Sequence, residues 1–171
     1  MAVRSQITPP NLTVEEDFDP VEAVAGFASE RKWAFERTGD MVQWLVHGQS
    51  ADYSVCYTWY PDMCIMGYVC GFNQKTPRRR VRQTIELISR INECLPVGHF
   101  ELRVEDGLVI FRNGLLLPYG EISDAQTYQL LKTGLNACDL YHPSFHLALI
   151  GLPAERAFHE GTCLSEPQGN A

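Results

Sequence analysis

Apolar residues recur along this chain with two spacings, which separate the predicted strands from the predicted helices. Short runs that are rich in aromatic and β-branched side chains and bounded by turn residues favour strands. Longer runs with an apolar residue at every third or fourth position favour helices. The sequence predicts six strands, over residues 33–38, 41–47, 53–60, 63–72, 99–104 and 108–117.

Turn signals join these strands in pairs. Gly39-Asp40, Pro61-Asp62 and Glu105-Asp106-Gly107 each separate two neighbouring runs, as hairpin loops do. Residues 53–60 have no charge and are neutral or apolar on both faces, which places this strand near the middle of a sheet. Because hairpins join antiparallel strands, the predicted class is α+β, a mainly antiparallel sheet with helices on one face in the order α-β-β-β-β-α-β-β-α.

Start signals mark three helices. The first covers residues 20–32, with Asp19 as its N-cap. The second covers residues 76–95. The third begins at the capping box Ser123–Gln126 and has a long apolar stripe. Pro143 lies inside this last helix, so we expect a kink or a division there.

Length and composition fit one folded domain. A chain of 171 residues with 45% hydrophobic content can bury a substantial core. We expect a flexible N-terminal lead over residues 1–18 and a single domain over residues 19–159. Residues 160–171 are rich in small and polar residues and are expected to form a disordered tail.

Charge is unevenly distributed along the chain, whose net charge is −7. Acidic residues gather at positions 15–22 and basic residues at positions 75–82. The overall negative charge opposes binding to nucleic acid or to anionic membranes. The start of the chain has no apolar signal-peptide core, and the apolar run at residues 145–152 is too short to cross a bilayer. We therefore expect a cytoplasmic protein with no nucleic-acid partner and no membrane partner.

The six cysteines are expected to be free thiols. Cys64 and Cys70 lie on one predicted strand, about 20 Å apart and too far for a disulfide. Cys56, on the neighbouring strand, faces away from both. No Cys-x-x-Cys pair is present, which argues against redox or zinc sites of that type. Five thiols should be shielded, whereas Cys163 in the polar tail should be exposed.

The run Arg78-Arg79-Arg80 is a candidate partner-binding site. Guanidinium groups bind phosphates and acidic segments through charge-assisted hydrogen bonds. Positive charge in a first helical turn opposes the helix dipole, so the run is locally unfavourable. The alternatives are a solvated charged face and pairing with the chain's own acidic N-terminal run.

Histidines and aromatic residues are weaker candidates. His142 and His146 are four residues apart, one turn after Asp139, a spacing that suits a metal ion. Pro143 distorts this turn, and no metal is expected. His99 has no evident nucleophile or carboxylate partner, so capping, packing or a partner contact is expected of it. Trp59, like other aromatic residues of the sheet, either packs in the core or lines an interface.

Motifs of covalent catalysis and nucleotide binding are missing from the sequence. It contains no Gly-x-Gly-x-x-Gly, Walker loop, Gly-x-Ser-x-Gly elbow or His-Glu-x-x-His. We therefore expect neither an enzyme nor a bound cofactor.

Three segments carry a resemblance to a known family: Asp52–Trp59, Leu95–Leu102 and Tyr141–Phe145. From about residue 19 to residue 158 the chain resembles the alphaproteobacterial branch of the YbjN family. That family is described as sensory-transduction regulators, and its fold is like that of type III secretion chaperones, which usually have five strands. The resemblance implies this fold and, by analogy, a homodimer that binds extended polypeptide segments.

The leading functional hypothesis is a cytoplasmic, non-enzymatic regulator or adaptor that acts through protein–protein contacts as a homodimer, with an unidentified protein partner. Its dimer contact is expected at the second helix or an adjoining sheet edge. The second hypothesis is a chaperone-like module that holds an extended client segment. The third is a small hydrolase that uses a metal or Cys and His residues.

Overall fold

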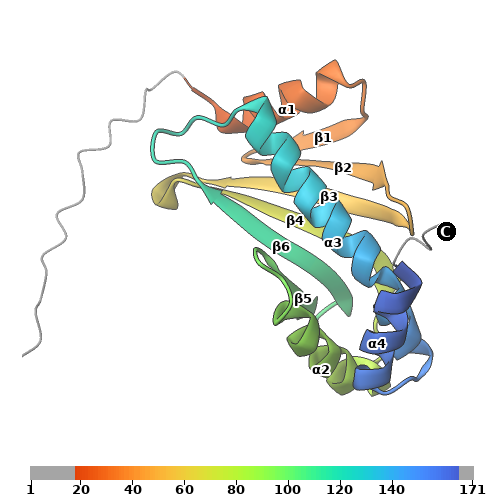
Figure 1. The fold of residues 1–171 in the computed structure, drawn as a ribbon. Coiled ribbons are helices and arrows are strands. Elements are labelled where there is room, and N and C mark those ends of the chain that lie inside the picture. Colours follow the sequence, from red (N-terminus) through yellow and green to blue (C-terminus); the bar gives the residue numbers. More distant parts are fainter. Residues whose placement is uncertain (1–17, 166–171) are drawn as a thin grey trace, which may run out of the picture.

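Six strands and four helices make up residues 18–165, the part of the chain that the computed structural model describes (Figure 1). The strands are β1 (Phe35–Thr38), β2 (Met41–His47), β3 (Asp52–Tyr60), β4 (Ile65–Lys75), β5 (His99–Arg103) and β6 (Leu108–Leu116). The helices are α1 (Pro20–Glu30), α2 (Val81–Asn92), α3 (Asp124–Ile150) and α4 (Ala154–Ser165). Two short 3-10 helices precede β4 and α2, namely η1 (Pro61–Met63) and η2 (Arg78–Arg80).

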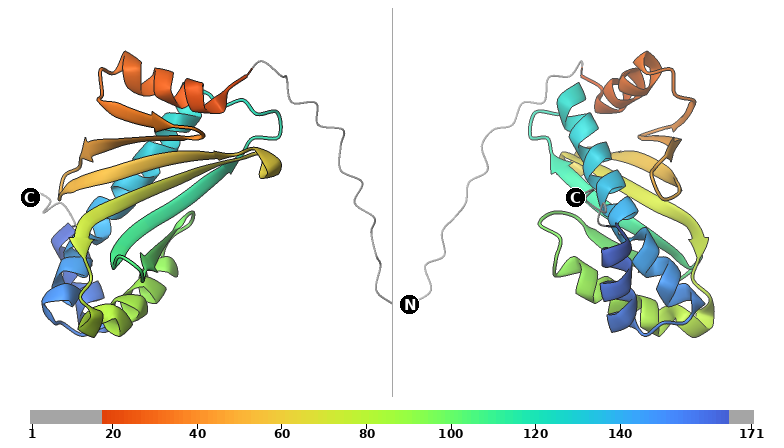
Figure 2. Two further views of the ribbon diagram at one scale, coloured as in Figure 1. Left: turned by 180° about the vertical axis from the view of Figure 1, so that it is seen from behind. Right: turned by 45° about the vertical axis from the view of Figure 1, so that its right-hand side comes forward.

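The strands form one antiparallel sheet in the order β1-β2-β3-β4-β6-β5. The helices lie on one side of this sheet, with α3 running diagonally across it, as Figures 1 and 2 show. The predicted α+β class is therefore confirmed, with one helix more than the sequence suggested. Within residues 18–165 no helix has both the length and the apolar character needed to cross a membrane.

Three buried tyrosines connect the sheet to α3. They lie on the inner face of the sheet, which is the face that packs against the helices. Their hydroxyl groups donate to acceptors on that helix: Tyr53 to Asp139 Oδ1 at 2.7 Å, Tyr57 to the Thr127 carbonyl at 2.8 Å and Tyr68 to the Leu131 carbonyl at 3.4 Å. Burial raises the pKa of each tyrosine above its usual value, so all three remain neutral donors. Helix α3 approaches β4 closely at Gly134, where an added Cβ would overlap the ring of Tyr68.

Helix α1 starts at the predicted cap. Asp19 Oδ1 accepts hydrogen bonds from the backbone N–H groups of Val21 at 2.8 Å and Glu22 at 3.2 Å. Asp19 and Glu22 also bind Arg37 on β1. Two acidic residues of the N-terminal run therefore fasten α1 to the edge of the sheet and do not pair with Arg78–Arg80.

Pro143 neither ends nor divides α3, so the expected division at this residue is wrong. A proline removes the hydrogen bond to the carbonyl four residues earlier, which here belongs to Asp139. That carbonyl instead accepts a hydrogen bond from Ser50 Oγ, at 3.3 Å, in the loop after β2. The helix continues to Ile150 and ends at Gly151, whose φ of 127° lies in a region that favours glycine.

The chain after Gly151 folds back as α4, which packs against α3 and α2 (Figure 1). The prediction of a disordered tail from residue 160 is wrong for residues 160–165, which belong to this helix. Ala154 and Ala157 are buried in the core, and Phe158 stacks on Tyr141 with ring centroids 6.4 Å apart. Residues 166–171 and residues 1–17 lie outside the described part of the chain.

The connection between β3 and β4 is longer than the predicted two-residue turn. It consists of η1 and Cys64, which has a left-handed φ of 51° and precedes the strand. As a result Thr58 opposes Gly67 and Cys56 opposes Val69, whereas a two-residue turn at Pro61-Asp62 would have set Cys56 opposite Gly67. Cys56 still faces away from Cys70, which is buried on the inner side.

Candidate partner-binding surface

The outer face of the sheet is not covered by any helix of residues 18–165, as the view from behind in Figure 2 shows. Strand alternation assigns side chains to this face, because their neighbours along each strand are the buried inner residues. The centre of the outer face, on β3 and β4, carries no charge: its residues are Ser54, Cys56, Thr58, Ile65, Gly67 and Val69. On β6 the outer positions are Ile110, Arg112, Gly114 and Leu116, and Arg112 lies directly opposite Val69.

Charged pairs border this uncharged centre. His47 Nδ1 lies 2.6 Å from Asp52 Oδ1 at one end of the β2–β3 pair. Arg112 on β6 donates to Glu101 Oε1 on β5 at 2.8 Å. This hydrogen bond and the nearby guanidinium charge lower the pKa of Glu101. An uncharged centre with a charged rim is the arrangement found in protein–protein contact surfaces.

Exposed apolar side chains gather where the outer face meets the loops at one end of the sheet. We call Tyr60, Met63, Leu116 and Tyr119 the apolar end; they are 38%, 58%, 71% and 61% exposed. The Leu117 N–H donates to the Cys64 carbonyl at 2.8 Å and so holds the loop after β6 against the turn after β3. Apolar clusters of this kind on a surface mark binding sites more often than single exposed residues do.

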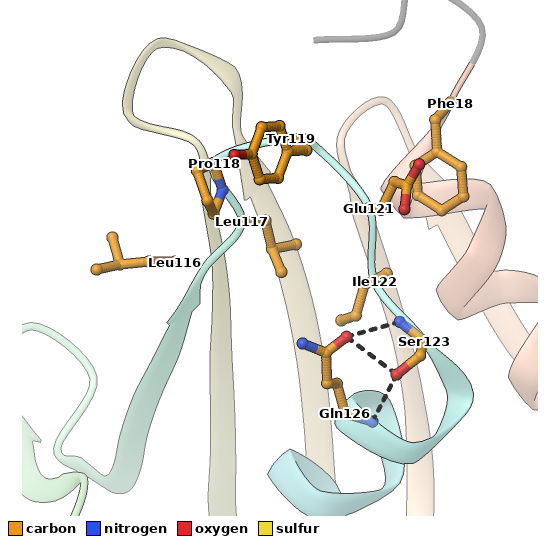
Figure 3. A pocket seen from close by; sticks show the side chains of 9 residues that line it. All are labelled: Phe18, Leu116, Leu117, Pro118, Tyr119, Glu121, Ile122, Ser123 and Gln126. Atoms are coloured by element: carbon orange, nitrogen blue, oxygen red, sulfur yellow. Dashed lines mark hydrogen bonds between the residues drawn. The ribbon is translucent and has the colours of Figure 1, made fainter. Parts of the chain in front are cut away.

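A shallow groove adjoins the apolar end (Figure 3). Its volume is about 360 Å³, and Leu116, Pro118 and Tyr119 line one side of it. Phe18, at the start of the described chain, lies on the other side. The floor includes the capping box of α3, in which Ser123 Oγ accepts from the Gln126 N–H at 3.3 Å. The groove is apolar apart from Glu121 and this cap, so it suits an apolar side chain of a partner.

The three arginines of the predicted site do not act as one unit. Arg80 is half-buried, donates to Gln83 Oε1 at 3.1 Å and lies against Gly151 at the end of α3. A cation at a helix C-terminus is favourable, so Arg80 has a structural role. Arg78 and Arg79 are exposed and form no ion pair with any residue in the range 18–165.

Trp59 and His99 lie in two other parts of the fold. Trp59 is partly buried against the core at the end of β3, and its backbone N–H donates to the Asp40 carbonyl at 2.8 Å. His99 is half-exposed on the outer side of β5, with Nε2 3.7 Å from Glu101 Oε2. The sequence-based candidates are therefore separated, and only His99 lies on the outer face.

Asp139, His142 and His146 do not converge on a common point. The Asp139 carboxylate accepts from the N–H groups of Gln49 and Ser50, at 3.0 and 2.9 Å, in addition to the Tyr53 hydroxyl. The ring of His142 packs against Phe72, and its pKa is lowered by burial and by His146. Among residues 18–165 no three His, Cys, Asp or Glu side chains are grouped as a metal site requires.

All six cysteines are free thiols, as the sequence predicted. Cys163 is exposed, but Cys94 is exposed too, because α2 ends at Asn92 and leaves Cys94 outside its buried stripe. Cys70 and Cys138 are buried, and their Sγ atoms are 3.5 Å apart. Burial and this contact raise the pKa of Cys138 well above its usual value, so it is a packed thiol and not a nucleophile.

Sequence reasoning missed the apolar end and the Asp139 contacts. A signal for the first was present in Leu115-Leu116-Leu117, because three successive apolar residues on a strand must place the middle one on the opposite face. Asp139 gave no such signal, since its partners in the loop after β2 are 89 and 90 residues away in sequence.

Comparison with known proteins confirms the resemblance. The chain matches the YbjN family, described as "Putative bacterial sensory transduction regulator", over residues 20–147. The fold is similar to the crystal structure of YbjN from E. coli, "a putative transcription regulator", with a TM-score of 0.51 and 8% identity over 87% of this chain and 96% of that chain. At this identity the likeness concerns the fold alone. No curated protein sequence matches the chain. Because the family match spans most of the 171 residues, the chain belongs to the YbjN family.

Proposed function

We propose that this protein is a non-enzymatic regulator or adaptor that works in the cytoplasm through protein–protein contacts and as a homodimer. The observation that carries the proposal is the open outer face with its uncharged centre and the adjoining apolar end. Isolated monomers rarely leave such connected apolar surface in water. Membership of a family described as regulators supports the same function, and six free thiols suit a reducing compartment.

We place the dimer contact on the outer face and not at a sheet edge. At the β5 edge the side-chain amide of Asn92 on α2 pairs with both backbone groups of Phe100, at 2.8 and 3.0 Å. This pairing occupies the groups that another strand would need. At the β1 edge, two copies could pair strand to strand about a twofold axis through the middle of β1. Glu36 or Arg37 would then face the same residue of the other copy, and the like charges would repel each other. The first feature disfavours the edge contact expected beside the second helix, and the second disfavours a contact at the opposite edge.

The test of this proposal is the mass of the protein in solution. Light scattering at micromolar concentration should give about twice the chain mass of 19.3 kDa. Leu116→Glu places a charge in the apolar end, where the side chain is 71% exposed, and should shift the protein to monomer without unfolding it. Leu164→Glu is the matched control, because Leu164 is 69% exposed on α4. A wild-type monomer at all accessible concentrations would overturn the dimer.

A chaperone-like module that binds an extended segment is the second candidate, because one edge of the sheet remains open. Strand β2 runs to His47, but β1 pairs with it only up to Trp44, so the last three residues of β2 have no partner strand on that side in the described part of the chain. A groove of about 710 Å³ lies beside this uncovered end, lined by Trp33, Trp44 and Leu45 among others. An extended peptide could pair with β2 there. Hydrogen exchange that slows at residues 45–47 when an unfolded client is added would favour this candidate.

A further inference from the structure

A basic cluster at the start of α2 has no acidic partner within residues 18–165. We call Lys75, Arg78, Arg79 and Arg82 the basic face; all four side chains are exposed, and none forms an ion pair with a described residue. The charges lie within eight residues of each other, in a protein with 21 acidic and 14 basic residues. They also lie at a helix N-terminus, where positive charge is unfavourable. An acidic segment placed on this face would relieve both costs.

The chain itself contains such a segment immediately before the described part. Glu15, Glu16 and Asp17 are consecutive and are followed by Phe18. The next two acidic residues, Asp19 and Glu22, are already paired with Arg37. The N-terminal run contains three further carboxylates, equal in number to the three arginines of the basic face.

These two sets of charges cannot meet within one copy of the chain. Phe18 lines the same groove as Ser123 and Gln126, at the beginning of α3. Arg80 lies against Gly151, at the end of α3. Helix α3 has 27 residues, and at a rise of 1.5 Å per residue it is about 40 Å long. Residues 15–17 are at most three residues from Phe18 and reach no further than about 11 Å from it.

We infer that residues 15–17 of one copy dock on the basic face of a second copy. Charge complementarity identifies the occupant, and the length of α3 determines that the contact is between copies. The net charge of −7 argues against nucleic acid as the ligand of this face. In a twofold dimer each copy gives one acidic segment and receives one. This contact rests on the proposed homodimer and adds to it a second, salt-dependent interface.

Lys75 allows this contact to be detected directly, because its amine can be joined to a carboxylate by a zero-length carbodiimide cross-link. Full-length protein is mixed in light and ¹⁵N-labelled forms, equilibrated, cross-linked at low salt and analysed by mass spectrometry. The expected product joins Lys75 of one isotopic form to Glu15, Glu16 or Asp17 of the other. Cross-links confined to one isotopic form, or none between these residues, would overturn the inference.

Charge reversal provides the quantitative test. One variant carries Arg78→Glu, Arg79→Glu and Arg82→Glu, and the other carries Glu15→Arg, Glu16→Arg and Asp17→Arg. Each alone should dimerise about tenfold more weakly than the wild type, the loss expected of a few exposed ion pairs. The mixture should recover the wild-type affinity, because in the mixed dimer each segment over residues 15–17 meets a face of opposite charge on the other copy. Raising the salt to about 0.5 M should remove the difference through screening.

The controls separate this inference from the proposed homodimer. Lys132→Glu changes one exposed charge on α3 and should leave dimerisation unchanged. If both triple variants dimerise like the wild type at low salt, the docking of residues 15–17 is wrong and the homodimer stands. If the wild type is a monomer at every salt concentration, both proposals are wrong.

Discussion

The two faces of the sheet differ in what their side chains already contact. On the inner face, aromatic rings fill the space below the helices, and the tyrosine hydroxyl groups are satisfied by α3. On the outer face the central positions of β3 and β4 carry small, neutral or apolar groups, and the described helices leave them uncovered (Figure 2). The inner face therefore determines much of the stability of the fold, whereas the outer face is not covered by any of the described helices.

The largest effect should come from removing an inner ring. Tyr68→Ala removes a fully buried side chain that contacts Tyr57, with ring centroids 5.0 Å apart, and α3 at Gly134. We expect a loss of about 3–5 kcal/mol in the free energy of unfolding. Val69→Ala, the next residue on the same strand but on the outer face, should cost about 1 kcal/mol or less. Urea denaturation measures the loss in the free energy of unfolding for each variant. Equal losses in Tyr68→Ala and Val69→Ala would contradict the division into two faces.

A medium effect is expected at the loop after β2. Asp139→Ala leaves the Tyr53 hydroxyl and the N–H groups of Gln49 and Ser50 without their acceptor. Loss of these hydrogen bonds should cost about 2–3 kcal/mol. It should also speed amide exchange in the loop, while dimer mass stays unchanged. Asp139→Asn keeps one acceptor oxygen and should lose less. A variant as stable as the wild type would show that this loop does not depend on α3.

The smallest effect concerns the Glu101–Arg112 pair at the border of the outer face. Arg112 lowers the pKa of Glu101 below its usual value of about 4.5. The pair therefore contributes stability that is fully present above that value and is lost as the pH falls through the lowered pKa of the folded state. Because the side chains of Arg112 and Glu101 are 41% and 34% exposed, solvent screens the pair, and we expect it to contribute about a few tenths of a kcal/mol. The stability difference between wild type and Glu101→Gln should shrink between pH 6 and 3, and a constant difference would contradict this assignment.

Local signals in the sequence predicted much of the fold. The N-cap at Asp19 and the capping box at Ser123 depend on neighbours within a few residues, and both are confirmed. The predicted division of the helix at Pro143 is wrong: α3 continues to Ile150, and the carbonyl that the proline leaves unpaired accepts a hydrogen bond from Ser50, 89 residues away.

The proposed binding surface was harder to predict for the same reason. Arg80 looked equivalent to Arg78 and Arg79 until its contact with Gly151, 71 positions later in the chain, separated it from them. The apolar end joins residues of two loops, and the Cys70–Cys138 contact joins a strand to a helix 68 residues away. Such contacts follow from how elements pack together, which periodicity along one element does not report.

Thiol labelling tests the role of the outer face most directly. Cys56 lies at the centre of that face and is half-buried, whereas Cys94 is exposed beyond the end of α2. Wild-type protein is labelled under native conditions at concentrations below and above the dimerisation midpoint, and the rate at each thiol is read by mass spectrometry. We predict that Cys56 becomes severalfold slower in the dimer while Cys94 keeps its rate. If Cys56 reacts equally fast in monomer and dimer, the outer face is not the interface.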